Sequence, residues 1–281
     1  MSSPGKITIN IMGGLGNQLF QIFTLIATSM EYGIEFYLPD YKGMLGIDKV
    51  SDRPSYWDYF FKEIKHRIKK YPIKTIINET SSFSYKKIII DKNSTTKLQG
   101  YFQNDKYFQK YATEIKQILN ITEKQNQVKQ KYNLNDKLIS IHFRIGDYKA
   151  NTKYHPILTS DYYIKCFSNI INRIGNNYTF VCFFEKNDKD SIVKTINILK
   201  HNFRLEIFEK NIHFKLINTD IPDYEQLLYM SLCEHNIIAN STFSWWGAYL
   251  NKNKNKIVYM PQKWCIIGIL CDVPDCDVVR F

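Results

Sequence analysis

The stretch that decides the fold covers residues 7–39 and reads ITINIMGGLGNQLFQIFTLIATSMEYGIEFYLP. Apolar residues alternate through residues 7–11, as in a strand, and a glycine-rich turn follows at residues 13–16. Apolar residues then recur at helical spacing, at Leu19, Ile22, Phe23 and Ile26. Gly33 ends this helix, and residues 34–38 read as a second strand. The stretch therefore predicts a strand–helix–strand unit with parallel strands.

The same alternation of strands and helices continues along the chain. Further strands are expected at residues 97–102, 138–143, 178–184, 236–240 and 256–260, the last of these being the final strand. Helices are expected at residues 105–119, 161–174, 188–199 and 222–235. This order indicates an α/β fold with parallel sheets, whose ligands bind at the carboxyl ends of the strands.

Residues 122–137 are strongly polar and interrupt the pattern. Such a stretch is typical of a domain boundary and equally of an exposed helix. We expect a first domain over residues 1–132 and a second over residues 133–281, with a C-terminal tail that could pack back on the first.

The composition indicates a globular protein with a basic surface. The chain has 281 residues, of which 44% are hydrophobic, so disorder of the whole chain is excluded. Its net charge of +11 favours anionic partners, although a solvated, lysine-rich surface explains the charge equally well. No nucleic-acid-binding signature is present, so we expect no nucleic-acid partner. Peripheral contact with an anionic membrane is a hypothesis that the charge permits.

The cysteines and the N-terminus point to the cytoplasm. Six cysteines without a CxxC pair read as reduced thiols. A zinc site at Cys265, Cys271 and Cys276 is disfavoured, because the spacing fits no known pattern. Neither a signal peptide nor a membrane-spanning run is visible. We expect a cytoplasmic protein, soluble or peripherally associated with a membrane.

The first motif with chemical content is Gly13-Gly14-Leu15-Gly16-Asn17-Gln18. Glycines between a strand and a helix let a phosphate or a sugar approach the backbone, where helix N–H groups are free. A simple tight turn is the alternative. A dinucleotide-binding turn is another, with Asp40 as the ribose-binding acid, although Leu19 replaces the last glycine of that fingerprint.

The second motif is His142-Phe143-Arg144-Ile145-Gly146-Asp147-Tyr148, at the end of an expected strand. An arginine beside a glycine turn at a strand end is well placed to bind a diphosphate through both arms. The alternative is an ion pair between Arg144 and Asp147 that braces the turn.

The third motif is Asn240-Ser241-Thr242-Phe243-Ser244-Trp245-Trp246-Gly247, which follows an apolar strand and opens a helix. Hydroxyl and N–H groups at a helix start bind phosphate oxygens, and tryptophans stack on bases or sugars. The alternative is a capped helix with Trp245 and Trp246 in the core, where at least one of the two is expected.

Taken together, the three motifs resemble those of the α-1,2-fucosyltransferases of glycosyltransferase family eleven. Gly13 to Gln21 matches G-G-x-G-N-Q-[LM]-F-Q, and His142 to Tyr148 matches H-x-R-R-G-D-Y except at Ile145, which replaces the second arginine. Ile237 to Ala248 matches I-x-A-N-S-[ST]-F-S-W-W-G-A, and Gly100 to Gln103 matches G-Y-F-Q. The matches keep the family's order from residue 13 to residue 248.

The resemblance implies a GT-B-like fold, with two Rossmann-like domains whose parallel sheets face a central cleft. It implies that the first domain binds the acceptor and the second the nucleotide sugar. It also implies GDP-fucose as the donor, a terminal galactoside as the acceptor of L-fucose at its 2-hydroxyl, and inversion at the transferred carbon.

The resemblance also assigns roles to residues. Arg144 holds the β-phosphate, and Asn17, with the Gly14 and Gly16 backbone, faces the reacting sugar. Glu225 is assigned to the nucleoside. The remaining donor-site positions are Gln18, Asn240, Ser241, Thr242, Phe243, Ser244, Trp245 and Trp246.

The mechanism expected from charge needs fixed positive groups beside the departing diphosphate. No D-x-D pair lies at a plausible strand end, so Arg144 and helix N–H groups take this role, with no metal and no other cofactor expected. His142 and Asp147 are both candidates for a general base, and a reaction without a base is a third possibility.

Two rival functions remain at this point. One is a family member that uses another nucleotide-linked deoxysugar, since Ile145 departs from the motif. The other is an NAD-dependent oxidoreductase, which rests on the glycine turn alone and leaves the second and third motifs unexplained.

Overall fold

The computed structural model describes residues 4–45, 52–81, 83–134, 137–203, 212–265, 268, 270–275 and 277–281. By their internal contacts, the residues form two compact units, Met1–Lys124 and Gln125–Phe281. The boundary between the two units lies inside helix α3 (Ile121–Lys131). This helix covers much of the polar stretch at residues 122–137. The division after residue 132 stays a prediction.

The first unit is built on a four-stranded parallel sheet of order β2-β1-β6-β5. Its strands are β1 (Lys6–Ile9), β2 (Glu35–Phe36), β5 (Thr75–Asn78) and β6 (Thr96–Gln99). Helix α1 (Leu15–Tyr32) follows β1, and most of its residues are buried. Gly33 ends α1 in the left-handed conformation, φ 63°, which glycine adopts without the steric cost of a Cβ.

Short elements complete the first unit. They are the antiparallel pair β3 (Met44–Leu45) and β4 (Asp52–Arg53), the 3-10 helices η1 (Lys62–Arg67), η2 (Asp105–Tyr107) and η3 (Gln109–Tyr111), and helix α2 (Ala112–Ile118). A continuous helix over residues 105–119 was expected, and this is wrong: two 3-10 turns precede the α-helix. Asn104 caps η2 by accepting from the Lys106 N–H, which favours a turn over a longer helix.

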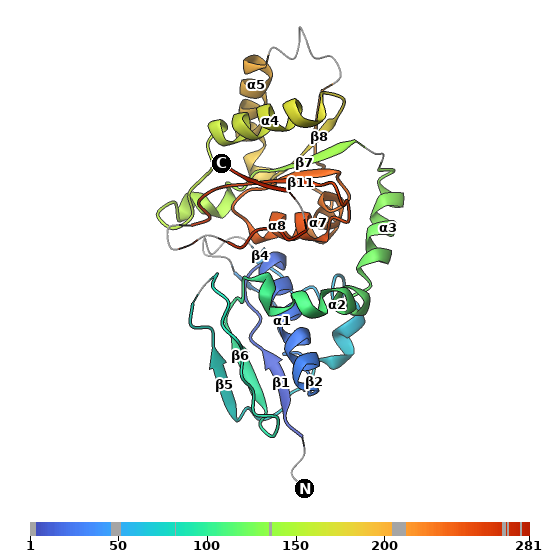
Figure 1. Cartoon of the computed structure of the whole chain (residues 1–281), viewed down its shortest axis with the longest axis vertical. Coiled ribbons are helices and arrows are strands. Elements are labelled where there is room, and N and C mark those ends of the chain that lie inside the picture. Colours follow the sequence, from blue (N-terminus) through green and yellow to red (C-terminus); the bar gives the residue numbers. More distant parts are fainter. Residues whose placement is uncertain are drawn as a thin grey trace. The chain divides into compact units, whose positions relative to one another are not determined.

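The second unit contains a six-stranded parallel sheet of order β12-β11-β10-β7-β8-β9 (Figure 1). Its strands are β7 (Leu138–His142), β8 (Thr179–Phe183), β9 (His213–Leu216), β10 (His235–Ile237), β11 (Ile257–Met260) and β12 (Asp277–Arg280). Helices α4 (Ser160–Ile174) and α5 (Lys189–Asn202) cover one face, and α7 (Asp223–Met230) and α8 (Thr242–Leu250) the other (Figure 1). The 3-10 helices η4 (Gly146–Ala150) and η5 (Lys186–Asp188) follow β7 and β8.

Aromatic side chains fill the two layers of the second unit. Phe167 of α4 packs on Phe180 and Phe214, with ring centroids 4.8 and 5.5 Å apart. On the other face, Tyr229 of α7 meets Phe183 edge-on at 5.6 Å. These contacts place the core of the second unit on both faces of β8.

The two parallel-sheet α/β units confirm the expected fold class. Two expected boundaries are wrong. Residues 256–260 are not the last strand, because β12 adds a further strand beside β11. The helix that begins after Pro222 ends at Met230 rather than near residue 235, because His235 already belongs to β10.

Candidate functional site

The predicted donor residues of the second unit gather at the carboxyl ends of neighbouring strands. Arg144 follows β7 and Asn240 follows β10, and these two strands are adjacent in the sheet. Glu185 follows β8 on the other side of β7. The carboxyl edge of a parallel sheet is where α/β proteins bind ligands.

Arg144 is the centre of a charged cluster at this edge. One arm of its guanidinium donates to Asp147 and the other to Glu185. The Asp147 side chain is 9% exposed and that of Glu185 is 41% exposed. Burial alone lowers the pKa of Arg144, but the two carboxylates outweigh burial and raise it. Arg144 is therefore a permanent cation here, and the Arg144–Asp147 pair that was the alternative reading is present.

His142 lies beneath this cluster as a neutral side chain. Its ring is buried and lies 5.7 Å from the ring of Phe243. Burial, followed by the charge of Arg144, lowers the pKa of His142 to about 3. Such a weak base is poorly matched to proton abstraction near neutral pH. Asp147, the other candidate base, has its carboxylate paired with Arg144.

The start of α8 lies beside the arginine turn. The Tyr148 hydroxyl donates to the Asn240 carbonyl at 2.7 Å, which joins the second motif to the third. Asn240 is fully buried, and its amide donates to the carbonyls of Pro156 and Trp264. Ser241 is the N-cap of α8 but its side chain makes no capping bond, whereas Thr242 and Phe243 are partly exposed. The helix start thus presents backbone N–H groups toward the carboxyl edge.

Three of the residues assigned to the donor lie in the core instead. Ser244, Trp245 and Trp246 are all 0% exposed. The two indole rings pack edge-on against each other at 5.3 Å, and Trp245 also stacks on Tyr249 at 5.0 Å. Every residue of α8 from Ser244 to Leu250 is buried, whereas Thr242 and Phe243 at its start are partly exposed. In this structure neither tryptophan presents a surface to a ligand.

Glu225 lies in the first turn of α7 and is held by residues near the end of α3. Lys131 donates to both carboxylate oxygens, at 2.9 and 2.8 Å, and the Tyr132 hydroxyl donates to one of them. The assignment of Glu225 to a nucleoside stays a prediction.

In the first unit, the glycine motif forms the turn between β1 and α1. Gly13 has φ 76°, and a Cβ on it would lie 2.5 Å from the Asn17 amide nitrogen, so glycine is needed here. Gly14 is the N-cap of α1 and Asn17 is partly exposed. Gln18 is fully buried, and its amide donates to the carbonyls of Gly13 and Pro54 at 2.9 and 2.8 Å. Gln18 thus supports the turn from within.

A second loop of the first unit meets this turn. The Gln103 amide donates to the Asn17 side-chain oxygen at 2.8 Å. Glu79 accepts from the N–H groups of Tyr101 and Phe102, at 2.8 and 3.0 Å, and so fixes the loop. The structure therefore brings Gly13–Asn17 and residues 100–103 together within the first unit.

Glu185 and His155 were missed from the sequence. Glu185 is the first charged residue after the expected strand at residues 178–184. A charged residue directly after a strand is also the pattern that identified Arg144, so the sequence could have indicated Glu185. His155 lies in the loop between η4 and α4, and no sequence pattern marks it.

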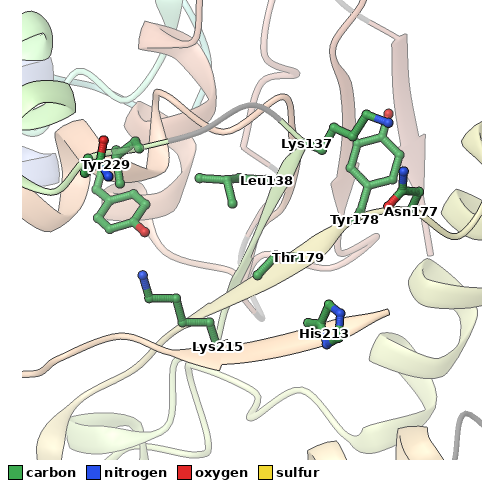
Figure 2. Close-up of a pocket in the computed structure, with 10 residues that line it drawn as sticks. Lys137, Leu138, Asn177, Tyr178, Thr179, His213, Lys215 and Tyr229 are labelled. Carbon is green, nitrogen blue, oxygen red and sulfur yellow. The ribbon is translucent and has the colours of Figure 1, made fainter. Parts of the chain in front are cut away.

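The second unit also contains a cavity of about 400 Å³ (Figure 2). Its lining includes Leu138, Thr179 and His213, which are the first residues of β7, β8 and β9. Lys215 and Tyr229 also line it. None of the predicted site residues lines it. The cavity therefore opens at the amino end of the strands, opposite the edge where Arg144 lies.

Two further searches concern the described part of the chain alone. Among those residues, no group of three or more histidine, cysteine, aspartate or glutamate side chains is arranged to hold a metal ion. Cys276, one of the three tail cysteines, lies outside the described residues. No described helix is both long and apolar enough to cross a bilayer.

Comparison with known proteins extends over almost the whole chain. The family model described as Glycosyl transferase family 11 matches residues 1–264. An α-1,2-colitosyltransferase of Escherichia coli is 28% identical over 280 residues, which cover 92% of both chains. WbnK, an O-antigen biosynthesis glycosyltransferase of Escherichia coli, is 34% identical over 135 residues, 46% of this chain and 40% of WbnK.

Solved structures are similar at lower identity. Arabidopsis thaliana FUT1, solved in complex with GDP, is 10% identical with a TM-score of 0.48, over 96% of this chain and 74% of the other. A glycosyl transferase family 9 protein from Veillonella parvula is 11% identical with a TM-score of 0.47, over 98% of this chain and 87% of the other.

Proposed function

Because this chain belongs to glycosyltransferase family 11, we propose that it transfers L-fucose from GDP-fucose to the 2-hydroxyl of a terminal galactoside. The transfer inverts the configuration at the transferred carbon. The α-1,2 linkage in the name of the colitosyltransferase, which matches over 92% of both chains, supports the linkage. The O-antigen role in the name of WbnK supports an oligosaccharide of a surface polysaccharide as the acceptor.

The observation that carries the proposal is the place of Arg144 at the carboxyl end of β7, beside the start of α8. As the glycosidic bond breaks, negative charge grows on the departing diphosphate. A fixed guanidinium and helix N–H groups stabilise that charge more in the transition state than in the ground state. Since these groups belong to the chain itself, the proposed mechanism requires no metal.

The first unit has a separate role in this proposal. Asn17 and the Gly13–Gly14 backbone form a polar turn held by Gln18 and Gln103, which suits hydrogen bonding to sugar hydroxyls. We assign this turn to the reacting sugars. The net charge of +11 supports peripheral contact with an anionic membrane, where lipid-linked acceptors reside.

A second donor deserves a test because of the colitosyltransferase. Colitose differs from fucose by the loss of one ring hydroxyl. Replacement of a hydroxyl by hydrogen is discriminated strongly only where the protein hydrogen-bonds that hydroxyl. GDP-colitose is therefore the alternative donor.

The experiment compares transfer from GDP-fucose and GDP-colitose to a panel of terminal galactosides with EDTA present. Product mass and NMR define the sugar and the linkage. Wild-type protein should form the α-1,2-fucosyl product, and Arg144→Ala should lose about 100-fold or more in kcat. Arg173→Ala removes an arginine of the same unit that pairs with Asp277, and should be nearly unchanged. Near-normal turnover in Arg144→Ala would contradict the mechanism, and transfer of colitose alone would contradict the donor.

A further inference from the structure

His155 lies at the carboxyl edge of the second unit and has no role in the site as described so far. Its imidazole stacks on the ring of Tyr148, with centroids 4.6 Å apart and planes 20° from parallel. The Arg144 guanidinium carbon lies 5.2 Å from the centroid of the same Tyr148 ring. One tyrosine thus links the imidazole to the arginine that the proposed function assigns to the diphosphate.

The loop that carries His155 is fixed by hydrogen bonds. The N–H groups of Tyr154 and His155 both donate to the Asn151 carbonyl at 3.0 Å. The Pro156 carbonyl accepts from the buried Asn240 amide at 2.8 Å. His155 is therefore held in place by Asn151, and the next residue, Pro156, is tied to the third motif through Asn240.

The imidazole itself is half-buried. Its Nδ1 is buried without a hydrogen-bond partner among the described residues. His235, in contrast, uses its Nδ1 to accept from the Ile257 N–H. Buried polar atoms are normally satisfied, so an unsatisfied Nδ1 in a ring stacked on the tyrosine that also contacts Arg144 points to a partner that the ligand supplies.

We propose that His155 is a second side chain that contacts the donor diphosphate, and that its imidazole takes up a proton when the diphosphate binds beside Arg144. This inference rests on the proposed function. A protonated His155 adds a second positive charge at the carboxyl edge of the sheet, where Ile145, next to Arg144, supplies none.

The charges around His155 determine the direction of the proton transfer. Burial lowers the pKa of His155 in the free protein, with Asp147 raising it and Arg144 lowering it. The neighbouring titratable groups are Tyr148, whose ring it stacks on, Cys265 near Tyr148, and Glu185 beyond Arg144. A dianionic diphosphate beside the ring would raise its pKa. Since the pKa is then higher in the bound state, binding takes up a proton and strengthens as the pH falls.

The test is calorimetric titration of GDP-fucose into the full-length protein without acceptor, at about pH 6 and pH 8, where histidine is the side chain that ordinarily titrates. Both phosphates of this donor are esterified, so the donor itself stays a dianion over this range. The wild-type dissociation constant should be several-fold lower at the lower pH, because each unit of pKa difference is worth tenfold. Buffers of different ionisation enthalpy report the proton uptake directly.

His155→Gln should bind with a dissociation constant that no longer changes with pH, and should take up no proton. The matched control is His201→Gln, an exposed histidine on α5, which should keep the wild-type behaviour. Equal pH dependence in the wild type and His155→Gln overturns the proposal and leaves the proposed function standing.

The proposed function can fail separately. If UDP-galactose or dTDP-rhamnose binds and GDP-fucose does not, the donor assignment is wrong. The pH comparison with the nucleotide sugar that binds then decides the role of His155, because the diphosphate is common to all three. Binding of none of them overturns both proposals.

Discussion

Arg144 pairs with two carboxylates, those of Asp147 and Glu185. A diphosphate can bind the guanidinium only if one of these carboxylates leaves it. The three side chains carry a formal charge of −1 together, which repels a dianionic ligand. Glu185 is the more exposed carboxylate and follows a different strand, whereas Asp147 lies within the arginine turn. A Cβ on Gly146 would collide with the Glu185 carboxylate, so the glycine makes room for this pairing. We therefore expect the diphosphate to displace Glu185 and to leave Asp147 in place.

Glu185→Gln should raise the affinity for GDP, because the ligand no longer competes with a carboxylate for Arg144. A gain of about tenfold, or 1.4 kcal/mol, is expected in a titration at low salt. Asp220→Asn is the matched control. It also removes one negative charge, but from an exposed ion pair with Lys186, the residue that follows Glu185. An equal gain in both variants would reduce the effect to net charge, and weaker binding in Glu185→Gln would show that Glu185 contacts the ligand.

Single residues of the site differ in how far the sequence predicts them. Arg144 was identified because a strand-end arginine beside glycine has a recognisable local pattern. Its pairing with Glu185 depends on β7 and β8 being neighbours, which is a non-local property. Trp245 and Trp246 belong to a helix that is buried all round from Ser244 to Leu250, and the apolar, aromatic composition of α8 already favours this burial.

At the scale of elements, α7 and α8 pack through a glycine. A Cβ on Gly247 would lie 2.5 Å from the Met230 sulfur and 2.8 Å from its Cγ. Met230 is fully buried at the end of α7, so it has little room to move. This close approach positions α8, whose first turn belongs to the candidate donor site.

Gly247→Ala should destabilise the second unit by about 1–3 kcal/mol through overpacking. Denaturant unfolding of the single variants and of the double variant Gly247→Ala/Met230→Ala measures the coupling. The two changes should be less costly together than their sum, because the smaller side chain at residue 230 accepts the new methyl group. Additive effects would contradict the contact.

Sequence periodicity found the central strands, the edge strand β2 and the long helices, and it missed β3, β4, β5, β9 and β12. The two sheets were expected from the alternation of strands and helices, which persists through most of the chain. Strands β5 and β9 are largely exposed edge strands, so they lack the apolar run that marks a buried strand. Strand β12 is also at an edge and only partly buried.

For the molecule as a whole, the titration of histidine should weaken one unit before the other. His142, His155 and His235 all belong to the second unit, and burial is the largest cause of a lowered pKa for each of them. The first unit carries one histidine, His66, and its side chain is exposed. Because their pKa values are lower folded than unfolded, unfolding takes up protons, and stability is lost as the pH falls.

The free energy of unfolding of the second unit should fall by about 1.4 kcal/mol per pH unit from His142 alone, below the ordinary histidine pKa of about 6.5 and down to its folded value of about 3. Hydrogen exchange at several pH values between about 5 and 7 measures this loss in each unit separately. The His142→Gln variant should show a smaller pH slope. A slope that is equal in the two units, or unchanged in the variant, would contradict this assignment.

We propose that this family 11 glycosyltransferase uses a GDP-linked sugar without a metal. The most direct measurement is the thermal shift produced by GDP, UDP, dTDP, NAD or a short RNA, each tested separately with EDTA present. A ligand at 100 times its dissociation constant stabilises the fold by about 2.7 kcal/mol, which corresponds to several degrees. GDP alone should raise the melting temperature. A shift with UDP or dTDP instead would contradict the donor, and a shift only with NAD or RNA would contradict the account of the site.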